Sequence, residues 1–559
     1  MNGFFLKNIF HKICAFIKSC PVLFSLLAGG IAKSAFSSGE HVIALIISVE
    51  LFYFILSNLY STRSYCRALV AGYAYGLSLY GGILYWETYL HDYSIGEFSQ
   101  ALLTILFYLA SIAYVAFFFS IATYLSIRLA FNKLSLLVLW SIFITIAEIL
   151  QNHLCSGYPF TIIAYGTSGI PYFPNIATVF GSYGVTFLFL FIIALLNVKR
   201  TFIVGIVSLG AIIAHGFYTV QYKDDYIKQE NTFLVTIVQP NLDDYDRGHK
   251  DDCNDIAELA DVDKTFTGKR LIITPETIIL CNRNQIKDFQ EAMLKNDDTY
   301  AMTGFIEKVK HSNSRDVYGA NNTVTRYNAV HVYTRKESLN MSDDLNSFKD
   351  VAFYRKKHLI PFGEFFPNWF LFIAQFLPDF LIEDFIDESN ENGLKSGTDR
   401  NTIKLSGIDP FDMNICYDIV PPGESMDDPL LSSWMVNVIN LHNYCSTGIS
   451  DIAHQQNVIC RFRAIEFGKP IAVCANFGHS CFINCNGGII KKLSPDEKGA
   501  IHQEFPLKYR LTTFCKYKNF TLYFVFVLLF IILFVGMMLQ DNGKVKDKKS
   551  KKTYSRDGK

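Results

Sequence analysis

The apolar residues of this chain are gathered into long runs near its two ends. Seven runs precede residue 221 and an eighth lies near the C-terminus: 13–36, 40–58, 66–88, 99–125, 133–152, 176–197, 200–220 and 520–539. A helix crosses the hydrocarbon core of a bilayer with about 20 mostly apolar residues. The pattern therefore predicts a membrane domain of seven helices over residues 1–221 and an eighth transmembrane helix over 519–540.

Residues 222–518 follow a different pattern, in which short apolar runs alternate with polar, helix-compatible segments. The predicted strands are 233–238, 271–274, 301–304, 329–333, 413–417, 435–439, 471–475 and 481–484. The predicted helices are 251–263, 284–296 and 451–468. Such alternation is typical of layered α/β domains. The expected fold is a multi-pass α-helical membrane domain of about eight spans with an inserted α/β domain.

Charge in the short loops indicates an orientation. Basic residues lie before the first run and between runs two and three, four and five, and six and seven: Lys7, Lys12, Lys18, Arg63, Arg67, Arg128, Lys133, Lys199 and Arg200. The alternate loops are acidic or nearly uncharged. Basic loops face the cytoplasm, so residues 222–518 are expected outside it. The tail 541–559 has eight basic against three acidic residues and is expected inside. A cleaved signal peptide at the first run is an alternative that leaves the domain on the same side.

Composition narrows the class of protein. Half of the 559 residues are hydrophobic, 49 of them are Phe, and the formal net charge is zero. A soluble enzyme of this size rarely has such a composition, and no nucleic-acid-binding motif is present. The 13 cysteines lack the paired spacing of a zinc site. We therefore expect neither a metal, nor an organic cofactor, nor a nucleic-acid partner.

Three residues in or next to apolar runs could perform acyl transfer together. Cys416 lies within the run 413–419, Glu276 follows the run 271–274, and Lys356 lies in the block 354–364. Acyl transfer needs a nucleophile, a base and a group that stabilises negative charge. The thiol, the carboxylate and the ammonium supply these in that order. A cysteine in an apolar strand is more often part of the core. The catalytic interpretation of Cys416 therefore depends on its occurrence together with Glu276 and Lys356.

Four motifs resemble, in order, the nitrilase-type carbon–nitrogen hydrolase superfamily: Val238-Gln239-Pro240-Asn241, Pro275-Glu276-Thr277, the block Tyr354–Glu364, and Ile415-Cys416-Tyr417-Asp418. Together with the apolar runs, the chain is similar to the bacterial apolipoprotein N-acyltransferases over about residues 20–540. Segments 156–160, 181–185 and 461–466 also resemble motifs of that family. Apart from substrate contact, Arg461, Arg463 and Glu466 could form an internal ion-pair network.

The resemblance implies an αββα sandwich and a reaction. An acyl chain passes from a membrane phospholipid to a thioester on Cys416, and then to the N-terminal amine of a diacylglyceryl-cysteine on a lipoprotein. Glu276 is implied as the base and Lys356 as the stabiliser of the oxyanion, while Glu364, Asp418 and Tyr417 support them. The implied location is the bacterial cytoplasmic (inner) membrane, with the catalytic domain on the periplasmic side and the lipid bilayer as a partner.

Several positions depart from the family pattern. Thr274 replaces a Trp, Asp418 replaces a Glu, and residues 440–445 differ from the usual Asn-Asp-Ala-Trp-Phe-Gly. These positions shape the family's substrate pocket, so acyl preference and acceptor range are open. A membrane-tethered amidase with the same three residues, or a catalytically idle lipid-binding homologue, are the alternatives. The aromatic segment 365–381 is expected to lie at the bilayer interface as an arm.

Overall fold

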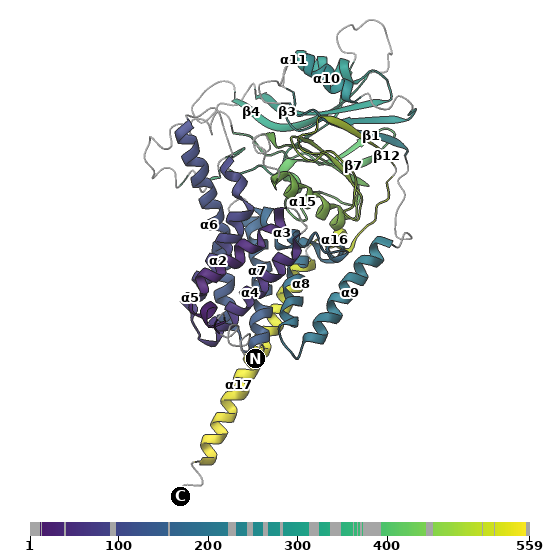
Figure 1. Cartoon of the computed structure of the whole chain (residues 1–559). Helices are drawn as coiled ribbons and strands as arrows, with labels where there is room; N and C mark the ends of the chain where they lie inside the picture. Colours follow the sequence, from purple (N-terminus) through teal and green to yellow (C-terminus); the bar gives the residue numbers. More distant parts are fainter. Residues whose placement is uncertain are drawn as a thin grey trace, which may run out of the picture.

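The protein consists of a helical bundle with an α/β domain stacked on one end of it (Figure 1). The computed structural model describes residues 12, 14–37, 41–89, 97–154, 157–221, 231–242, 250–260, 266–279, 283–311, 323–335, 348–361, 363–365, 367–368, 372, 393–442, 451–505, 507–518 and 520–554.

A helix occupies each of the eight apolar runs. The helices are α2 (Pro21–Ala32), α3 (Ser34–Ser37), α4 (Val42–Ser61), α5 (Tyr65–Ile83), α6 (Glu97–Leu129), α7 (Lys133–His153), α8 (Ala177–Leu196), α9 (Phe202–Gln221) and α17 (Phe520–Tyr554). Among the described residues, five helical segments are long and apolar enough to cross a membrane: Val42–Ser61, Thr104–Leu129, Lys133–His153, Phe173–Leu196 and Phe202–Gln221. The apolar helices Pro21–Ser37 and Phe520–Gly536 are shorter. A membrane domain is therefore present, whereas a count of eight spans remains a prediction.

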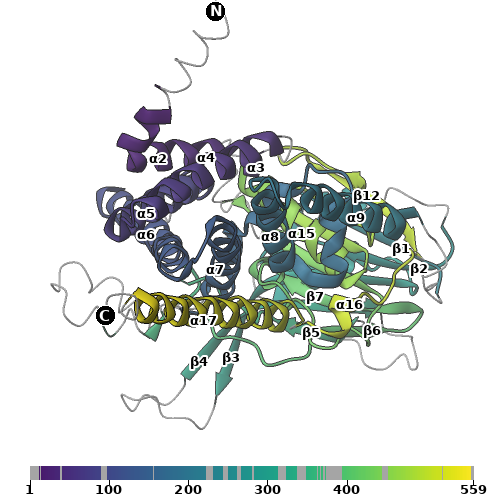
Figure 2. The ribbon, with the colours of Figure 1, turned by 90° about the horizontal axis from the view of Figure 1, so that it is seen from below.

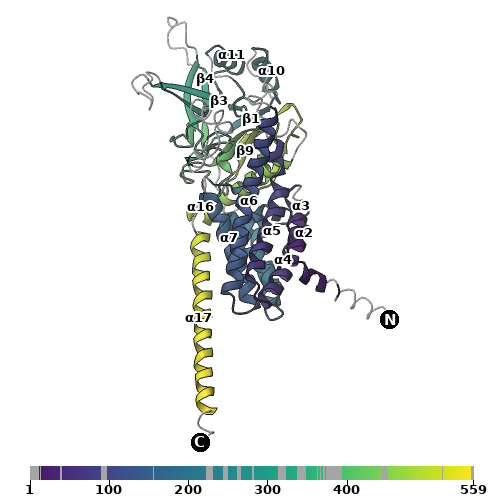
Figure 3. The ribbon, with the colours of Figure 1, turned by 90° about the vertical axis from the view of Figure 1, so that its left-hand side faces the viewer.

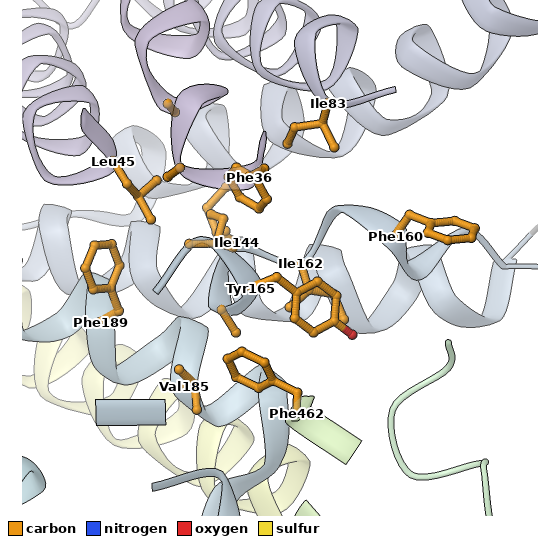
Figure 4. Packing of buried hydrophobic residues seen from close by; sticks show 14 of the residues in the cluster. Phe36, Leu45, Ile83, Ile144, Phe160, Ile162, Tyr165, Val185, Phe189 and Phe462 are labelled. Atoms are coloured by element: carbon orange, nitrogen blue, oxygen red, sulfur yellow. The ribbon is translucent and has the colours of Figure 1, made fainter. Parts of the chain in front are cut away.

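The bundle packs through large aromatic residues and close helix contacts. Phe52, Tyr53 and Tyr75 surround the buried Trp140 indole. A methyl group on Gly76 of α5 would lie 2.8 Å from the Cα of Ala116 on α6, so the two backbones approach closely there. Figure 4 shows how this packing continues through Ile144 and Val185 toward Phe462 of the α/β domain. The two parts of the chain thus share one hydrophobic cluster.

Two six-stranded sheets form the centre of the α/β domain. The first has the order β12-β1-β2-β3-β4-β5 and the second β11-β10-β9-β8-β7-β6. The strands are β1 (Phe233–Gln239), β2 (Lys269–Ile273), β3 (Thr299–His311), β4 (Thr323–Arg335), β5 (Phe348–Arg355), β6 (Thr402–Leu405), β7 (Ile408–Ile415), β8 (Trp434–Asn440), β9 (Ile471–Asn476), β10 (Cys481–Ile483), β11 (Ile489–Lys492) and β12 (Gly499–Phe505). Strands β1–β3 and β7–β9 run parallel, and the outer strands pair antiparallel.

Helices cover the outer faces of both sheets. The sheets face each other across a core that includes Phe233, Trp434 and Phe505. Helices α10 (Lys250–Ala260) and α11 (Arg283–Met293) pack on the first sheet, away from the bundle (Figure 1). Helix α15 (Asp451–Phe467) lies between the second sheet and the bundle. The expected αββα layering is confirmed, and all eight predicted strands and three predicted helices are present.

The last helix leads away from the α/β domain. Helix α17 packs against α7 and α8 through Val138, Ile142, Phe187 and Val525 (Figure 2). Its C-terminal half extends beyond the bundle at the end opposite the α/β domain (Figure 3). The helix therefore runs from the junction of the two parts toward the far side of the bundle. Which side of a membrane each end occupies stays a prediction.

Candidate active site

Cys416 lies where β7 ends and a single 3-10 turn, η7 (Cys416–Ile419), begins. Its φ is 49°, in the left-handed region that residues other than glycine rarely adopt. The residue is partly exposed, although Ile415 and Tyr417 on either side are buried. Its carbonyl oxygen accepts a hydrogen bond from Gln456 Nε2 at 3.2 Å. Such backbone conformations persist only when surrounding contacts hold them, and they are frequent at active sites.

Glu276 follows β2 in the turn after Pro275, and its carboxylate is buried. Asn328 Nδ2 donates to Oε1 at 2.6 Å, and the backbone N–H of Asn440 donates to Oε2 at 3.0 Å. Burial raises the pKa of Glu276; the charge of Lys356 lowers it and that of Glu364 raises it. The carboxylate is close enough to the thiol of Cys416 to raise the pKa of that thiol. A weakly acidic carboxyl group in contact with a thiol suits proton transfer.

Lys356 follows directly after β5 and is 1 % exposed. Its Nζ lies 2.8 Å from Glu364 Oε1 and 3.4 Å from Glu276 Oε1. Burial alone lowers the pKa of this ammonium, but the two carboxylates outweigh burial and raise the pKa well above its ordinary value. Lys356 is therefore charged over the physiological range.

The thiol of Cys416 is protonated at rest. Burial raises its pKa well above the usual value, and the charge of Glu276 raises it further. Lys356 has the opposite effect but does not dominate. Only the thiolate is a good nucleophile, so this site needs a base, and the carboxylate of Glu276 is in place.

Glu364 is the second carboxylate that contacts the Lys356 ammonium. Besides Lys356, its Oε1 accepts from Asn328 Nδ2 at 3.0 Å, and its Oε2 accepts from the N–H of Ile360 at 2.8 Å. Asn328 on β4 thus donates to both carboxylates. Sequence reasoning missed this residue. The signal was present, because Asn328 is an amide placed next to the apolar residues Ala329 and Val330 of a buried strand.

Asp418 joins the Lys356 segment to the end of β7. Its carboxylate accepts from the N–H groups of Lys357 (3.2 Å), His358 (2.7 Å) and Ile415 (3.1 Å), and from the hydroxyl of Tyr354 (3.0 Å). Burial raises the pKa of Asp418, against the effect of His358 and Lys356. The carboxylate therefore acts on the backbone that carries Lys356.

Tyr417 links the site to the bundle. Its hydroxyl donates to the carbonyl of Gly157 at 3.3 Å, and its ring centroid lies 5.5 Å from that of Phe160. Both partners belong to the stretch between α7 and α8. The site therefore lies at the junction between the α/β domain and the membrane helices.

A buried ion pair on α15 is a second contact between the two parts. Arg463 Nη1 lies 2.7 Å from Glu466 Oε2, and both residues are fully buried. Ser182 of α8 donates to Glu466 Oε1 through its N–H and its hydroxyl, each at 2.6 Å. Arg463 Nη2 also donates to Tyr165 Oη at 3.0 Å. The predicted internal pair is confirmed for these two residues, whereas Arg461 donates to the carbonyl of Gly487 at 2.8 Å.

Three further observations concern the surroundings of the site. Lys357, adjacent to the active-site lysine, forms an ion pair with Asp427 at 2.6 Å. The aromatic segment 365–381 lies almost wholly outside the described residues. Within the described ranges, no group of three or more His, Cys, Asp or Glu residues is arranged to hold a metal ion.

Family models match both the helical bundle and the α/β domain of the chain. Residues 28–195 match the model of the apolipoprotein N-acyltransferase N-terminal domain, and residues 256–510 match the carbon–nitrogen hydrolase model.

Individual relatives match over most of their length. An apolipoprotein N-acyltransferase of Rhodopseudomonas palustris is 26% identical over 466 residues, covering 79% of this chain and 81% of the relative. One of Rickettsia typhi is 24% identical over 504 residues, covering 86% and 92%. A solved amidase from Nesterenkonia sp. covers 50% of this chain and 92% of its own, with 12% identity and a TM-score of 0.31, which is too low to carry weight. With the N-terminal domain model and the carbon–nitrogen hydrolase model matched in this order, the chain is similar to the apolipoprotein N-acyltransferases over most of its length.

Proposed function

We propose that this protein transfers an acyl chain from a membrane phospholipid, through a thioester on Cys416, to the N-terminal amine of diacylglyceryl-cysteine on apolipoproteins. One observation carries the proposal. A thiol, a buried carboxylate and a buried ammonium meet beside the membrane helices, with Glu276 in contact with both Cys416 and Lys356. The names of the relatives support the substrate class.

The first half-reaction loads the enzyme. Glu276 takes the proton of the Cys416 thiol, and the sulfur attacks the carbonyl carbon of a phospholipid ester. Negative charge develops on the carbonyl oxygen, where the Lys356 ammonium and the N–H of Tyr417, the amide next to the nucleophile, stabilise it. The carbon–oxygen ester bond then breaks. Glu276 returns the proton to the departing alkoxide, which leaves a thioester and a lysophospholipid.

The second half-reaction uses the same groups. The amine of the acceptor attacks the thioester carbon, and Glu276 takes a proton from the amine nitrogen. A second oxyanion forms at the same position and collapses as the carbon–sulfur bond breaks. The thiolate regains a proton from Glu276, and the product is an amide. One nucleophile serving donor and acceptor in turn predicts ping-pong kinetics.

The proposal includes the location of the chain. Residues 222–518 form the catalytic domain on the periplasmic side of the bacterial cytoplasmic membrane, and the tail 541–559 is cytoplasmic. The alternation of basic and non-basic loops supports this orientation. A reporter active only in the cytoplasm should work when fused after Lys559 and fail when fused near residue 310.

Mass spectrometry of the intact protein tests the chemistry. Incubation with phospholipid alone should add one acyl group that hydroxylamine removes, and the Cys416→Ala variant should gain none. Addition of a diacylglyceryl peptide should then move that group to the peptide's amine. Release of free fatty acid without an acylated amine would instead identify a hydrolase. No adduct on Cys416 while the complete reaction proceeds would overturn the thioester.

A further inference from the structure

A side-chain amide holds the peptide bond that follows the nucleophile. Gln456 on α15 is 3% exposed, and its Nε2 donates to the carbonyl oxygen of Cys416 at 3.2 Å. Gln456 has no part in the chemistry described above, and it approaches the nucleophile from a different element than Glu276 or Lys356 does. The contact is directed at the backbone and leaves the sulfur untouched.

Planarity of the peptide bond gives this contact a chemical consequence. The C=O of Cys416 and the N–H of Tyr417 belong to the same peptide plane and point in opposite directions when the bond is trans. An anchor on the carbonyl therefore sets the direction of the N–H. Cys416 has left the ladder of β7 and has a φ of 49°, so regular strand pairing does not orient this plane.

The element that carries Gln456 is itself attached to the membrane helices at both ends. Next to it, Gln455 accepts from the indole N–H of Trp86 at 3.2 Å and donates to the carbonyl of Ile83 at 3.0 Å. Two to three turns further along α15, the Arg463–Glu466 pair binds Ser182 of α8. The position of the Gln456 amide is thereby tied to the bundle as well as to the second sheet.

We propose that Gln456 is a positioning residue that orients the N–H of Tyr417 toward the developing oxyanion. Because α15 contacts both the second sheet and the bundle, this orientation depends on how the α/β domain packs on the bundle. The inference rests on the proposed acyl transfer. It adds that one of the two oxyanion donors, on the turn η7, is held in its orientation with the help of a side chain of the helix that contacts the membrane domain.

The proposal separates two reactions of the same sulfur. Alkylation by iodoacetamide is a displacement at a saturated carbon and forms no oxyanion. Acylation by phospholipid passes through one. Loss of the Gln456 anchor should therefore slow acylation and spare alkylation, whereas a general disturbance of the site would slow both.

The experiment uses the full-length protein in detergent or nanodiscs. The test variant is Gln456→Leu, and the matched control is Gln503→Leu, the same change at a partly exposed position on β12. Peptide mass spectrometry follows alkylation at Cys416, and intact mass follows acylation by phospholipid. Removing an oxyanion donor typically costs about 10²–10³ in rate. We expect acylation and transfer to the amine to fall by about 10–10² for Gln456→Leu, because the donor is misdirected rather than removed.

Other readouts for this variant should stay near the wild-type value. Alkylation of Cys416 and the KM for phospholipid should each change by no more than about twofold, since a donor that acts mainly in the transition state affects kcat. Gln456→Glu provides a second variant of the same size. When ionised, its carboxylate cannot donate, so its acylation rate relative to wild type should be low at alkaline pH and rise as pH falls and the carboxyl group is protonated.

Two outcomes would overturn the inference, and a third would overturn the proposed function. Acylation of Gln456→Leu within about twofold of the Gln503→Leu control would overturn the inference. Equal losses of acylation and alkylation would also overturn it, by assigning Gln456 a general structural role. A wild-type protein that never forms an acyl adduct would instead overturn the proposed function.

Discussion

The protein has two buried clusters of charge, and they are built differently. In the active site, one ammonium (Lys356) lies between two carboxylates (Glu276 and Glu364), and a thiol adjoins one of them. At the junction with the bundle, one guanidinium (Arg463) meets one carboxylate (Glu466); Ser182 donates to the carboxylate, and Tyr165 accepts from the guanidinium.

The difference matches the work each cluster does. At the junction, one ion pair and the hydrogen bonds of Ser182 and Tyr165 join α15 to the stretch that includes α8. Burial raises the pKa of a carboxyl group in both clusters, Glu276 and Glu466, but only Glu276 adjoins a thiol with which it can exchange a proton. Positive φ angles occur at both clusters: at Cys416 (49°) and at Thr277 (47°) beside Glu276 in the active site, and at Gly181 (66°) at the junction.

The backbone at the junction is irregular for a packing reason. Gly181, which precedes Ser182, has a φ of 66° within α8. A methyl group there would lie 2.3 Å from the ring of Phe514. Glycine thus lets α8 bend against the α/β domain and presents the N–H of Ser182 to Glu466.

The largest effect should follow from removing the nucleophile. Cys416→Ala should abolish both half-reactions while leaving the fold intact, because the residue contributes only its sulfur to the chemistry. Cys416→Ser should come close to the same loss, since a hydroxyl is far harder to deprotonate than a thiol. Adduct formation and amine acylation measure the two steps. Residual transfer by Cys416→Ala at more than a trace would point to another nucleophile.

The junction pair should respond in stability rather than chemistry. Arg463→Met leaves the buried carboxylate of Glu466 uncompensated and should lower the free energy of unfolding by about 3–5 kcal/mol. Denaturant or thermal unfolding in detergent measures the loss. Combining Arg463→Met with Glu466→Gln should cost less than the sum of the single changes, because the uncompensated charge is then absent. Strictly additive losses would show that the two residues do not act as a pair.

Lys356 should respond in chemistry. Lys356→Met keeps the length of the side chain but removes the ammonium, so each half-reaction loses a stabiliser of its oxyanion. We expect both rates to fall by about 10²–10³. Single-turnover acylation and transfer to an amine measure them separately. A change confined to one half-reaction would contradict a shared oxyanion position.

The pH dependence should reflect the raised pKa of Glu276. This carboxyl group acts as a base only when ionised, so acylation should be lost as pH falls through a pKa above the ordinary glutamic acid value of 4.5. Lys356 has a pKa well above its usual range, so no loss of its charge is expected at neutral or mildly alkaline pH. Initial rates of adduct formation across pH test this. In Glu276→Gln, the small residual rate of acylation should no longer fall at low pH. If the rate of this variant falls at low pH as it does in the wild type, the titrating group is not Glu276.

The smallest effect should come from lengthening a side chain near the site. Asp418→Ala removes the acceptor of three backbone N–H groups and one hydroxyl, and should lose activity. Asp418→Glu keeps the acceptor and restores the longer carboxylate of the family, so it should remain active. Comparing kcat of the two variants shows whether activity depends on a carboxylate at this position. Full activity of Asp418→Ala would mean that the position of Lys356 does not depend on this carboxylate.

Much of the architecture could be read from local patterns. Runs of apolar residues predicted where helices would form in the membrane domain, because the bilayer sets a minimum length for a span. The predicted strands 301–304 and 329–333 lie within the longer β3 and β4. Strands β5, β6, β11 and β12 were not predicted, since they are antiparallel outer strands with many polar residues and lack the buried apolar run of a central parallel strand.

The sequence by itself determined which residues are candidates for the chemistry and where the apolar helices form. Glu276, Lys356 and Cys416 each end a strand or follow one directly, and their residue types state the chemistry. Tertiary structure alone decided which further residues hold them: Asn328 between two carboxylates, Asp418 on the Lys356 segment, and Gln456 on the carbonyl of Cys416. Asn, Asp and Gln are as common on solvated surfaces as in buried networks. Only the packing of elements far apart in the chain turns their hydrogen bonds inward, since a buried polar group must find a partner and a solvated one need not.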